Sequence, residues 1–380
     1  MNILFFLNPG EKGGSNKSTY MLAKKIAKNH SLNSVIITPK WNVFNEMARQ
    51  DGMETFSIDY MYNGTHATAE HYRVIIKACL NKVYYWLAYR KLKKKFNWNE
   101  TLIHSGMSIL GIGSFLAKKT NAKHIMHLRE NPFPWIYLSK KEISRMNKEV
   151  DTFISISADT TNNWIKAGLN PKKISTIYNG IEPNLITSKI EYSTEPKFGI
   201  MINGWLSKAK GTDIAIEAMS KLSSEIRDKV YVDFYGVGTS DKNTKEYEEM
   251  IKKFEIQDFV TLKGYTEDIP SLLKNYDIGL MNSAREAFGR TTVEYMFSGL
   301  AVIASNTGAN TELIISEKFG LLYEYGNSTE LVERICELVN DPKRIKVIGL
   351  NGKCRAYDNF TADKNAQSVF DLYENLMKRV

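Results

Sequence analysis

The chain alternates short runs of β-branched and aromatic residues with longer segments of helical periodicity. In the helical segment 18–29, for example, Tyr20, Leu22 and Ile26 share one face. Such alternation is typical of βαβ units and parallel sheets. The predicted strands are 2–7, 34–38, 54–58, 102–104, 123–127, 152–155 and 173–177 in the first half, and 199–203, 230–236, 260–262, 278–281, 301–304 and 320–323 in the second.

The length of the chain predicts two domains, because 380 residues exceed one ordinary hydrophobic core. Residues 182–197 lack clear periodicity and contain two prolines, so we place the junction there. We therefore expect an N-terminal α/β domain at 1–185 and a second at 196–356. Each domain is expected to bind its ligand at the carboxyl ends of its strands.

The composition is that of a folded protein that stays in the cytoplasm. No apolar run approaches the roughly 18 residues that cross a bilayer. The first residues have no basic leader and are interpreted as a buried strand, not as a signal peptide. The three cysteines fit neither a disulfide framework nor a zinc site; they are Cys79, Cys336 and Cys354.

The positive charge is concentrated in the first half of the chain. Residues 1–185 hold 26 Lys and Arg against 13 Asp and Glu, whereas residues 186–380 hold 25 against 29. The first half is therefore expected to face something anionic, such as nucleic acid, anionic lipid or a phosphorylated acceptor. Nucleic acid is the weakest of these, because we find neither a groove-reading motif nor aromatic residues interleaved as stacking platforms.

Residues 72–98 combine aromatic and aliphatic side chains with a basic run at 90–95. This combination suits the headgroup region of an anionic membrane. An ordinary helix with a solvated basic end fits the same pattern. The excess positive charge of the first half favours a peripheral contact with the membrane through 72–98.

The strongest chemical signal is the segment 285–299, REAFGRTTVEYMFSG, which follows the predicted strand 278–281. Glu286 precedes a glycine turn, and Glu294 lies about one turn into the helix that follows. A turn of this kind directs backbone N–H groups and the positive end of a helix toward a ligand above the strand. The carboxylates suit sugar hydroxyls, which donate hydrogen bonds to them. Two solvated glutamates would show the same spacing.

This segment resembles the E-x7-E signature of glycosyltransferase family 4, whose enzymes have the two-domain GT-B fold. Further motifs agree with the family pattern, and together they cover nearly the whole chain: 178–181 (YNGI), Gly264, 298–303 (SGLAVI) and 308–312 (GANTE). The resemblance implies two Rossmann-like domains that face each other across a cleft. It also implies a C-terminal helix, 357–380, that crosses back to the first domain.

The resemblance also implies roles for residues of the second domain. Glu294 would bind the ribose hydroxyls of a nucleotide-sugar donor, and Glu286 the hydroxyls of the transferred sugar. Backbone amides near Phe288, Gly289 and Arg290 would hold the diphosphate. Gly264 and Tyr265 would border the base.

A second motif, 203–211 (NGWLSKAKG), is similar to the family pattern Gly-Arg-x-x-x-x-Lys-Gly. Gly204 and Lys210 match it and are expected to bind the diphosphate. Trp205 stands where the family has arginine and offers no charge. We predict that Arg290 replaces that arginine, with Lys208 as the alternative.

The loop 8–18 (NPGEKGGSNKS) is not a Walker motif, because Asn16 occupies the required glycine position. It resembles the glycine pair of the family, so Gly13 and Gly14 are expected to approach the acceptor. His127 matches the family histidine near the reacting sugar. Arg129 is expected to line the acceptor site; whether it pairs with Glu130 is left open.

We therefore predict a retaining, metal-independent glycosyltransferase that needs no cofactor. The catalytic residues would be His127, Lys210, Glu286 and Arg290. The donor would be a nucleotide sugar, with UDP favoured and GDP as the alternative. The acceptor would be a saccharide or lipid-linked saccharide in cell-surface polysaccharide synthesis. An epimerase or phosphorylase of the same fold, and an inactive binding subunit, are the competing hypotheses.

Overall fold

A computed structural model of the chain describes residues 1–10, 14–62, 71–132, 138–192, 197–238 and 240–378. The chain divides into two compact units, and each is described by itself. Unit 1 contains residues 1–180 together with 362–380, and unit 2 contains residues 181–361. In the described part of the chain, no helix is both long enough and apolar enough to cross a membrane.

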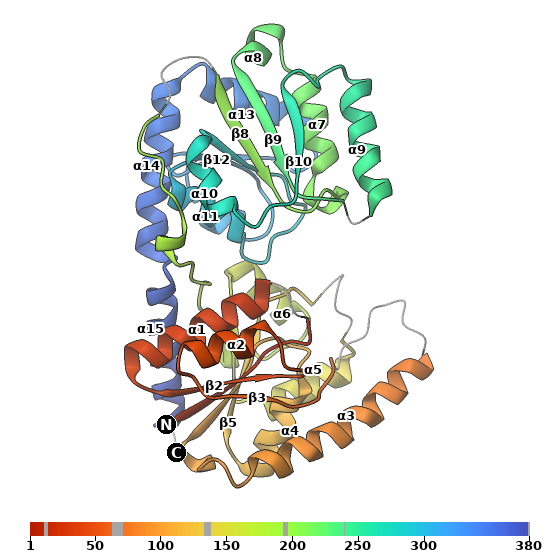
Figure 1. Cartoon of the computed structure of the whole chain (residues 1–380), viewed down its shortest axis with the longest axis vertical. Coiled ribbons are helices and arrows are strands. Elements are labelled where there is room, and N and C mark those ends of the chain that lie inside the picture. Colours follow the sequence, from red (N-terminus) through yellow and green to blue (C-terminus); the bar gives the residue numbers. More distant parts are fainter. Residues whose placement is uncertain (11–13, 63–70, 133–137, 193–196, 239, 379–380) are drawn as a thin grey trace. The chain divides into compact units, whose positions relative to one another are not determined.

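Unit 1 is built on a parallel sheet of seven strands in the order β3-β2-β1-β4-β5-β6-β7 (Figure 1). Its strands are β1 (Asn2–Phe6), β2 (Asn33–Thr38), β3 (Thr55–Ser57), β4 (Thr101–Ser105), β5 (Lys123–Leu128), β6 (Thr152–Ser155) and β7 (Ile174–Thr176). Its α-helices are α1 (Gly14–His30), α2 (Val43–Gln50), α3 (His71–Leu92), α4 (Gly111–Thr120), α5 (Lys140–Glu149), α6 (Ala158–Lys166) and α15 (Ala362–Met377).

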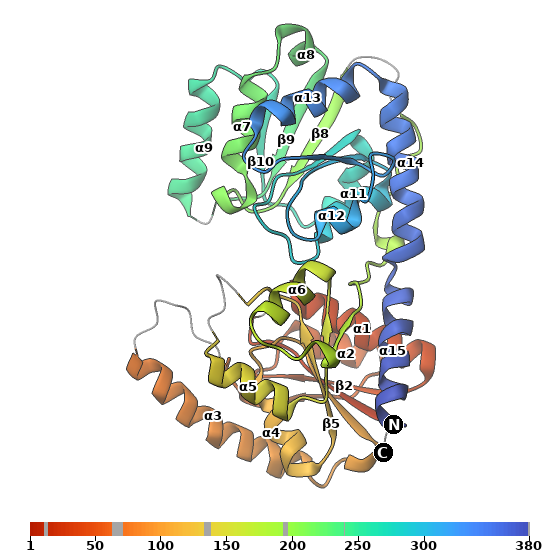
Figure 2. The ribbon, with the colours of Figure 1, turned by 180° about the vertical axis from the view of Figure 1, so that it is seen from behind.

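Both faces of this sheet are apolar, as expected where helices cover a parallel sheet on both sides. Alternate residues of β1 point to opposite faces, so Phe5 and Phe6 belong to different clusters of buried side chains. Helices α1, α2 and α15 cover the first face, and α3 and α4 cover the second. Helix α15 therefore completes the core of unit 1, although it follows unit 2 in the chain (Figure 2).

Unit 2 contains a parallel sheet of six strands in the order β10-β9-β8-β11-β12-β13. The strands are β8 (Phe198–Asn203), β9 (Val230–Tyr235), β10 (Val260–Gly264), β11 (Ile278–Met281), β12 (Ala301–Ser305) and β13 (Leu321–Tyr323). The α-helices are α7 (Thr212–Ser220), α8 (Ser224–Asp228), α9 (Asp241–Lys253), α10 (Ile269–Leu272), α11 (Arg290–Ser298), α12 (Asn310–Leu313), α13 (Ser328–Val339) and α14 (Pro342–Asn359).

The two faces of the second sheet are packed differently. Helices α7, α9 and α13 bury the large apolar side chains of one face, including Phe234 and Ile303. On the other face α11 approaches the sheet closely, because Gly279 of β11 leaves space for the ring of Tyr295. A Cβ atom at Gly279 would lie 2.3 Å from that ring.

The predicted fold class is confirmed, and every predicted strand is present within two residues at each end. Helix α1 begins at Gly14, four residues before the predicted start. The periodic pattern of apolar residues in α1 starts only at Thr19 and Tyr20. The pattern therefore does not predict the first turn of the helix. The buried side chain of Asn16 holds that turn instead, by binding the loop that precedes it.

Candidate functional site

The order of strands in unit 2 reverses between β8 and β11, and the predicted donor residues follow these two strands. At such a point the connections leave toward opposite sides of the sheet and open a place for a ligand at the carboxyl ends. The backbone N–H of Ala284, after β11, donates to the carbonyl of Ala209, after β8, at 2.9 Å. The two loops are therefore held together before any ligand binds.

Glycines end three neighbouring strands of this sheet. Gly204, Gly236 and Gly264 follow or close β8, β9 and β10, and all three have positive φ. The Gly204 N–H donates to the carbonyl of Tyr235, and the Gly236 N–H donates to that of Gly264. A Cβ at Gly236 would lie 1.8 Å from the Gly204 carbonyl oxygen, so only glycine fits. The strand ends therefore present bare backbone, which a flat or anionic ligand can approach closely.

The four charged residues predicted at this edge form two ion pairs. Lys210 Nζ lies 2.5 Å from Glu286 Oε1, and Arg290 Nε lies 2.8 Å from Glu294 Oε1. The two carboxylates are largely buried, with 14% and 13% of their side chains exposed, whereas Lys210 and Arg290 are more exposed. Each cation keeps unused N–H groups, because an ammonium has three and a guanidinium five. Both can therefore hold a phosphate as well as a carboxylate.

The amino end of α11 lies between the two carboxylates in sequence. Gly289 precedes the helix with a φ of +78°, and Phe288 is buried beside it. The first N–H groups of a helix have no partner within the helix, and the helix dipole favours an anion there. Thr292 and Asn310 fix this turn through a buried hydrogen bond of 2.9 Å.

Two further predicted donor residues, Lys208 and Tyr265, lie on the surface of the same edge, together with Trp205. Trp205 is 59% exposed and Tyr265 is 67% exposed. Lys208 is also exposed, in the short turn that precedes Gly211 and α7. Exposed aromatic rings at strand ends are available to stack on a planar group such as a base.

In unit 1 the order of strands reverses between β1 and β4. The loop after β1 is tied by two asparagines: Asn16 Oδ1 accepts from the Asn8 N–H at 2.8 Å, and Asn16 Nδ2 donates to the Asn8 carbonyl at 3.0 Å. Asn16, which breaks the Walker pattern, is thus a structural residue. Gly14 is the first residue of α1, and Gly13 lies outside the described residues.

His127 and Arg129, at the end of β5, belong to a buried polar cluster. Arg129 Nη2 donates to His127 Nδ1 at 3.3 Å, and its Nη1 donates to Asn179 Oδ1. His104 of β4 contacts His127 and the hydroxyl of Tyr373 on α15. His104 and Tyr373 were not predicted as site residues, because the contacts depend on segments far apart in the chain.

Burial lowers the pKa of both His104 and His127 well below the ordinary histidine value, and the charge of Arg129 lowers it further. Both imidazoles are therefore neutral near pH 7. Burial alone lowers the pKa of His124 to about 3. His124 bonds Ser105 Oγ at 2.9 Å, separately from the other two histidines.

The carboxylate of Glu130 binds Ser108, whereas the side chain of the neighbouring Arg129 binds His127 and Asn179. Its Oε1 accepts from the backbone N–H of Ser108 at 2.9 Å and from the Ser108 hydroxyl. Its Oε2 is buried and has no partner among the described residues. Burial raises the pKa of Glu130 to about 7, against the opposing effect of the Ser108 bonds.

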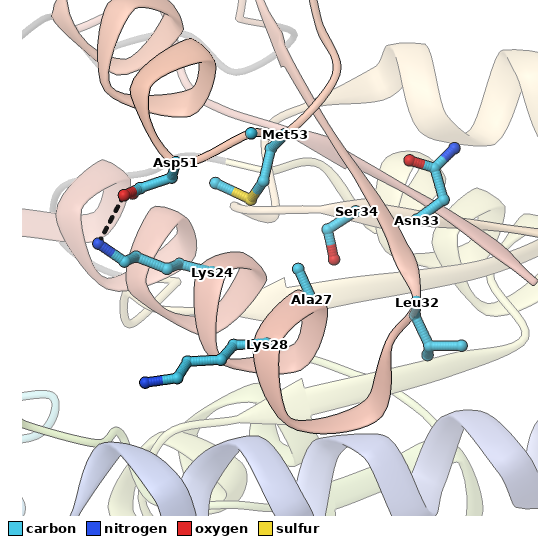
Figure 3. A pocket seen from close by; sticks show the side chains of 9 residues that line it. Lys24, Ala27, Lys28, Leu32, Asn33, Ser34, Asp51 and Met53 are labelled. Atoms are coloured by element: carbon cyan, nitrogen blue, oxygen red, sulfur yellow. Dashed lines mark hydrogen bonds and ion pairs between the residues drawn. The ribbon is translucent and has the colours of Figure 1, made fainter.

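Two pockets of unit 1 lie at opposite edges of its sheet. A pocket of about 460 Å³ lies near the amino ends of β2 and β3, beside the Lys24–Asp51 ion pair (Figure 3). A second, of about 560 Å³, lies at the carboxyl ends of β1, β2 and β3, which is the edge where ligands bind in parallel sheets. The second is lined by Pro9, Pro39, Lys40, Asn42, Asp59, Tyr60, Met61 and Tyr84.

Two family profiles match adjacent parts of the chain. The Glycosyltransferase Family 4 profile matches residues 12–185, and the Glycosyl transferases group 1 profile matches residues 187–355. Together they cover most of both units.

Named relatives are similar at low identity. The lipopolysaccharide core biosynthesis mannosyltransferase LpsB of Rhizobium meliloti is 26% identical over 63% of this chain and 69% of its own. The O-antigen biosynthesis glycosyltransferase WclY of Escherichia coli is 27% identical over 65% of this chain and 64% of its own.

Solved structures share the fold over the whole length. The Anabaena protein Alr3699/HepE in complex with UDP superposes with a TM-score of 0.80 at 20% identity and covers 99% of this chain and 100% of its own. A glycosyltransferase from Rickettsia africae gives 0.79 at 18% identity, over 100% of this chain and 99% of its own. These similarities show the GT-B fold.

The raised pKa of Glu130 predicts a difference in pH dependence between the wild type and Glu130→Gln. The folded wild type binds a proton on Glu130 below about pH 7, whereas an unfolded glutamate binds one only near pH 4.3. Lowering the pH from 8 to 6 should therefore stabilise the wild type relative to the variant, by about 1 kcal/mol at pH 6.

Thermal unfolding of both proteins at pH 8, 7 and 6 measures this difference. The histidines are common to both proteins, so their titration cancels in the comparison. A stability difference between the two proteins that stays the same from pH 8 to pH 6 would show that Glu130 is ionised in the folded state.

Proposed function

The chain belongs to glycosyltransferase family 4, and from this membership we propose that it transfers a sugar, with retention, from UDP-sugar to a lipid-linked saccharide without a metal ion. Unit 2 binds the donor and unit 1 binds the acceptor. The observation that carries the proposal is the pair of ion pairs at the β8–β11 edge, Lys210–Glu286 and Arg290–Glu294. UDP is favoured over GDP because the structural neighbour Alr3699/HepE binds UDP.

The donor would exchange partners with these ion pairs. Its ribose hydroxyls would donate to Glu294, and the hydroxyls of its sugar would donate to Glu286. Lys210 and Arg290 would then meet the diphosphate together with the amino end of α11. Each carboxylate would then accept hydrogen bonds from hydroxyl groups, and each cation would pair with a phosphate. Binding therefore leaves no buried charge uncompensated.

The reaction would break the bond between the anomeric carbon and the diphosphate oxygen. The acceptor hydroxyl would attack from the face on which the diphosphate leaves, and its proton would pass to the departing phosphate. Charge grows on the diphosphate as the bond breaks. Preorganised cations and helix N–H groups at that position stabilise this charge, which is the role that a metal ion takes in other transferases.

The names of the relatives support a place in cell-surface polysaccharide synthesis. LpsB is named for lipopolysaccharide core biosynthesis and WclY for O-antigen biosynthesis. The 560 Å³ pocket at the carboxyl ends of β1, β2 and β3 is our candidate for the saccharide end of such an acceptor.

Helix α3 carries an apolar stripe that would contact the membrane. Ile76, Leu80, Val83 and Leu87 recur at helical spacing and are 42–55% exposed, with Trp86 beside them. Tyr85, Ala88 and Leu92 are buried on the opposite side. The helix runs along the outside of its unit in both views (Figures 1 and 2). An exposed apolar stripe of this size is unusual for a surface that faces only water.

A basic cluster continues from the stripe. Arg90 lies over the ring of Trp86, and Lys93, Lys94 and Lys95 follow after the end of the helix. Residues 71–99 contain no acidic side chain. Apolar residues next to cations that form no ion pair within the described part of the chain fit the interface of an anionic bilayer, where each cation contributes about 1 kcal/mol. The partner we propose for α3 is therefore the anionic inner face of the cell membrane.

Glu294→Ala should weaken nucleotide binding, whereas Glu286→Ala should mainly lower turnover. Losing the ribose partner costs on the order of 1–3 kcal/mol, or roughly tenfold to a hundredfold in Kd. Titrating UDP, GDP and their sugars by calorimetry against the wild type and both variants measures this.

The unaltered wild type serves to identify the donor, because only a true ligand binds at micromolar concentration. If UDP binds Glu294→Ala as tightly as the wild type, the ribose assignment is wrong. Product analysis with and without acceptor separates a transferase from an epimerase. Turnover of any nucleotide sugar rules out an inactive binding subunit.

Arg290→Ala should lower kcat by about a hundredfold, because Arg290 would meet charge that grows in the transition state. Trp205→Arg should keep or raise activity, since it restores a cation at the position where the family has arginine. Lys208→Ala is the matched control, as it removes an exposed cation of the neighbouring turn. A large loss in Lys208→Ala with full activity in Arg290→Ala would give the role to Lys208.

Liposomes with anionic lipid should float the wild type, and salt should weaken this binding because exposed charges are screened within about 8 Å at physiological ionic strength. Neutralising Arg90, Lys91, Lys93, Lys94 and Lys95 should abolish it, as should the triple change of Val83, Trp86 and Leu87 to Ser. Changing Val347 and Leu350 of α14 to Ser is the control, since these residues are similarly exposed on unit 2.

A polarity-sensitive dye on a single cysteine locates the contact. Cys79 is exposed on α3 and Cys354 is exposed on α14, so each can be labelled after the other is replaced by Ser. Anionic vesicles should shift the emission of the dye at Cys79 and leave that at Cys354 unchanged. A wild type that stays in solution at low salt would contradict the membrane contact and favour a soluble acceptor.

A further inference from the structure

A chain of four buried polar side chains in unit 1 determines where His127 carries its proton. The four are Tyr373, His104, His127 and Arg129, and each is at most 8% exposed. Tyr373 Oη lies 2.6 Å from His104 Nδ1, and His104 Nε2 lies 3.1 Å from His127 Nδ1. Arg129 Nη2 lies 3.3 Å from the same His127 Nδ1.

Arg129 determines which atom donates in each hydrogen bond between these four side chains. A guanidinium can only donate, so His127 Nδ1 must accept. A neutral imidazole has one donor and one acceptor, and His127 therefore carries its hydrogen on Nε2. For the same reason His104 must donate from Nε2 and accept at Nδ1, where the Tyr373 hydroxyl donates to it.

The last donor in this series of hydrogen bonds is the Nε2–H group of His127. That nitrogen is buried and has no partner among the described residues. Leaving a buried N–H without an acceptor is unfavourable, and native proteins rarely do so unless a ligand or water completes the bond. The group can be completed by an oxygen with a free lone pair, and a group that only donates, such as an ammonium, would be rejected.

We propose that Tyr373 and His104 are positioning residues that, together with Arg129, hold His127 as an Nε2–H donor toward a hydroxyl oxygen of the sugar substrate. This inference rests on the proposed function for the identity of the substrate, and on the geometry of unit 1 alone for the tautomer. Tyr373 and His104 contact no substrate in this proposal. They act through His127, as outer partners fix the tautomer of catalytic and metal-bound histidines.

Nuclear magnetic resonance of the full chain labelled with ¹⁵N-histidine tests the tautomer without any substrate. Two-bond ¹⁵N–¹H correlations distinguish the Nε2–H, Nδ1–H and doubly protonated forms, and His104→Gln and His127→Gln assign the signals. We expect His104 and His127 both in the Nε2–H form at pH 7. A His127 that carries its proton on Nδ1, or on both nitrogens, would overturn the proposal.

Kinetics of two His104 variants then test the consequence. His104→Leu removes one of the two donors to His127 Nδ1 and should lower kcat about tenfold, with the KM for the nucleotide sugar within twofold because the nucleotide binds unit 2. His104→Gln retains an N–H donor at the position of Nε2 and should restore most of kcat. Tyr373→Phe keeps the buried ring and removes only the hydroxyl. It should increase the Nδ1–H form of His104 and lower kcat about threefold.

His124→Gln is the matched control, because it changes a buried histidine of the same sheet that bonds Ser105 and not His127. It should lower the unfolding temperature as much as His104→Leu and leave kcat and the His127 signals unchanged. If His104→Gln and His104→Leu lose the same activity, the positioning role is wrong. Absence of turnover with every donor would contradict the proposed function instead, while the spectra would still decide the tautomer.

Discussion

The functional residues of both units depend on one constraint, the reversal of strand order within a parallel sheet. Where the order reverses, neighbouring connections leave toward opposite faces, so no helix covers the strand ends between them. The reversal at β8 and β11 brings Lys210 to Glu286, although they are 76 residues apart. The reversal at β1 and β4 leaves the same edge of unit 1 open, and His127 and Arg129 end the next strand, β5. The opposite edge holds the surface ion pair of Lys24 and Asp51 beside a pocket.

The charges at the unit 2 edge are arranged so that each has a partner in the absence of ligand. The side chains of Glu286 and Glu294 are largely buried, and Lys210 and Arg290 each form an ion pair with one of them. The same cations are polyvalent donors, so compensation does not exhaust them. The glycines at the ends of β8, β9 and β10 remove side chains that would otherwise fill the space above these groups. An anion can therefore reach the backbone and the cations together.

The sequence predicted those parts of the molecule whose causes are local. Apolar runs located the strands, because most of the strands consist of residues that are buried on both faces of a sheet. The spacing of Glu286 and Glu294 located the donor edge, because a strand, a turn and a helix follow one another directly there. The partner of His104 was not predictable in this way. Tyr373 lies 269 residues further along the chain, on a helix whose pattern shows an apolar face but not which face it meets. Gly236 had a visible signal, since it ends the predicted strand 230–236, and Gly204 likewise follows the predicted strand 199–203. The need for glycine at this position nevertheless depends on the Gly204 carbonyl, in the loop after the neighbouring strand β8.

Helix α15 has a consequence for how the chain acquires its structure during synthesis. Unit 2 is one continuous segment, so it can fold once residue 361 has left the ribosome. Unit 1 is interrupted by unit 2, and its first 180 residues emerge long before Ala366, Val369 and Tyr373 are made. Until then the sheet face around Phe5 lacks its cover, and the imidazole of His104 lacks its donor. The core of nascent unit 1 therefore stays incomplete until unit 2 and α15 have been synthesised. Unit 1 is the part of the protein in which a chaperone would find exposed apolar surface.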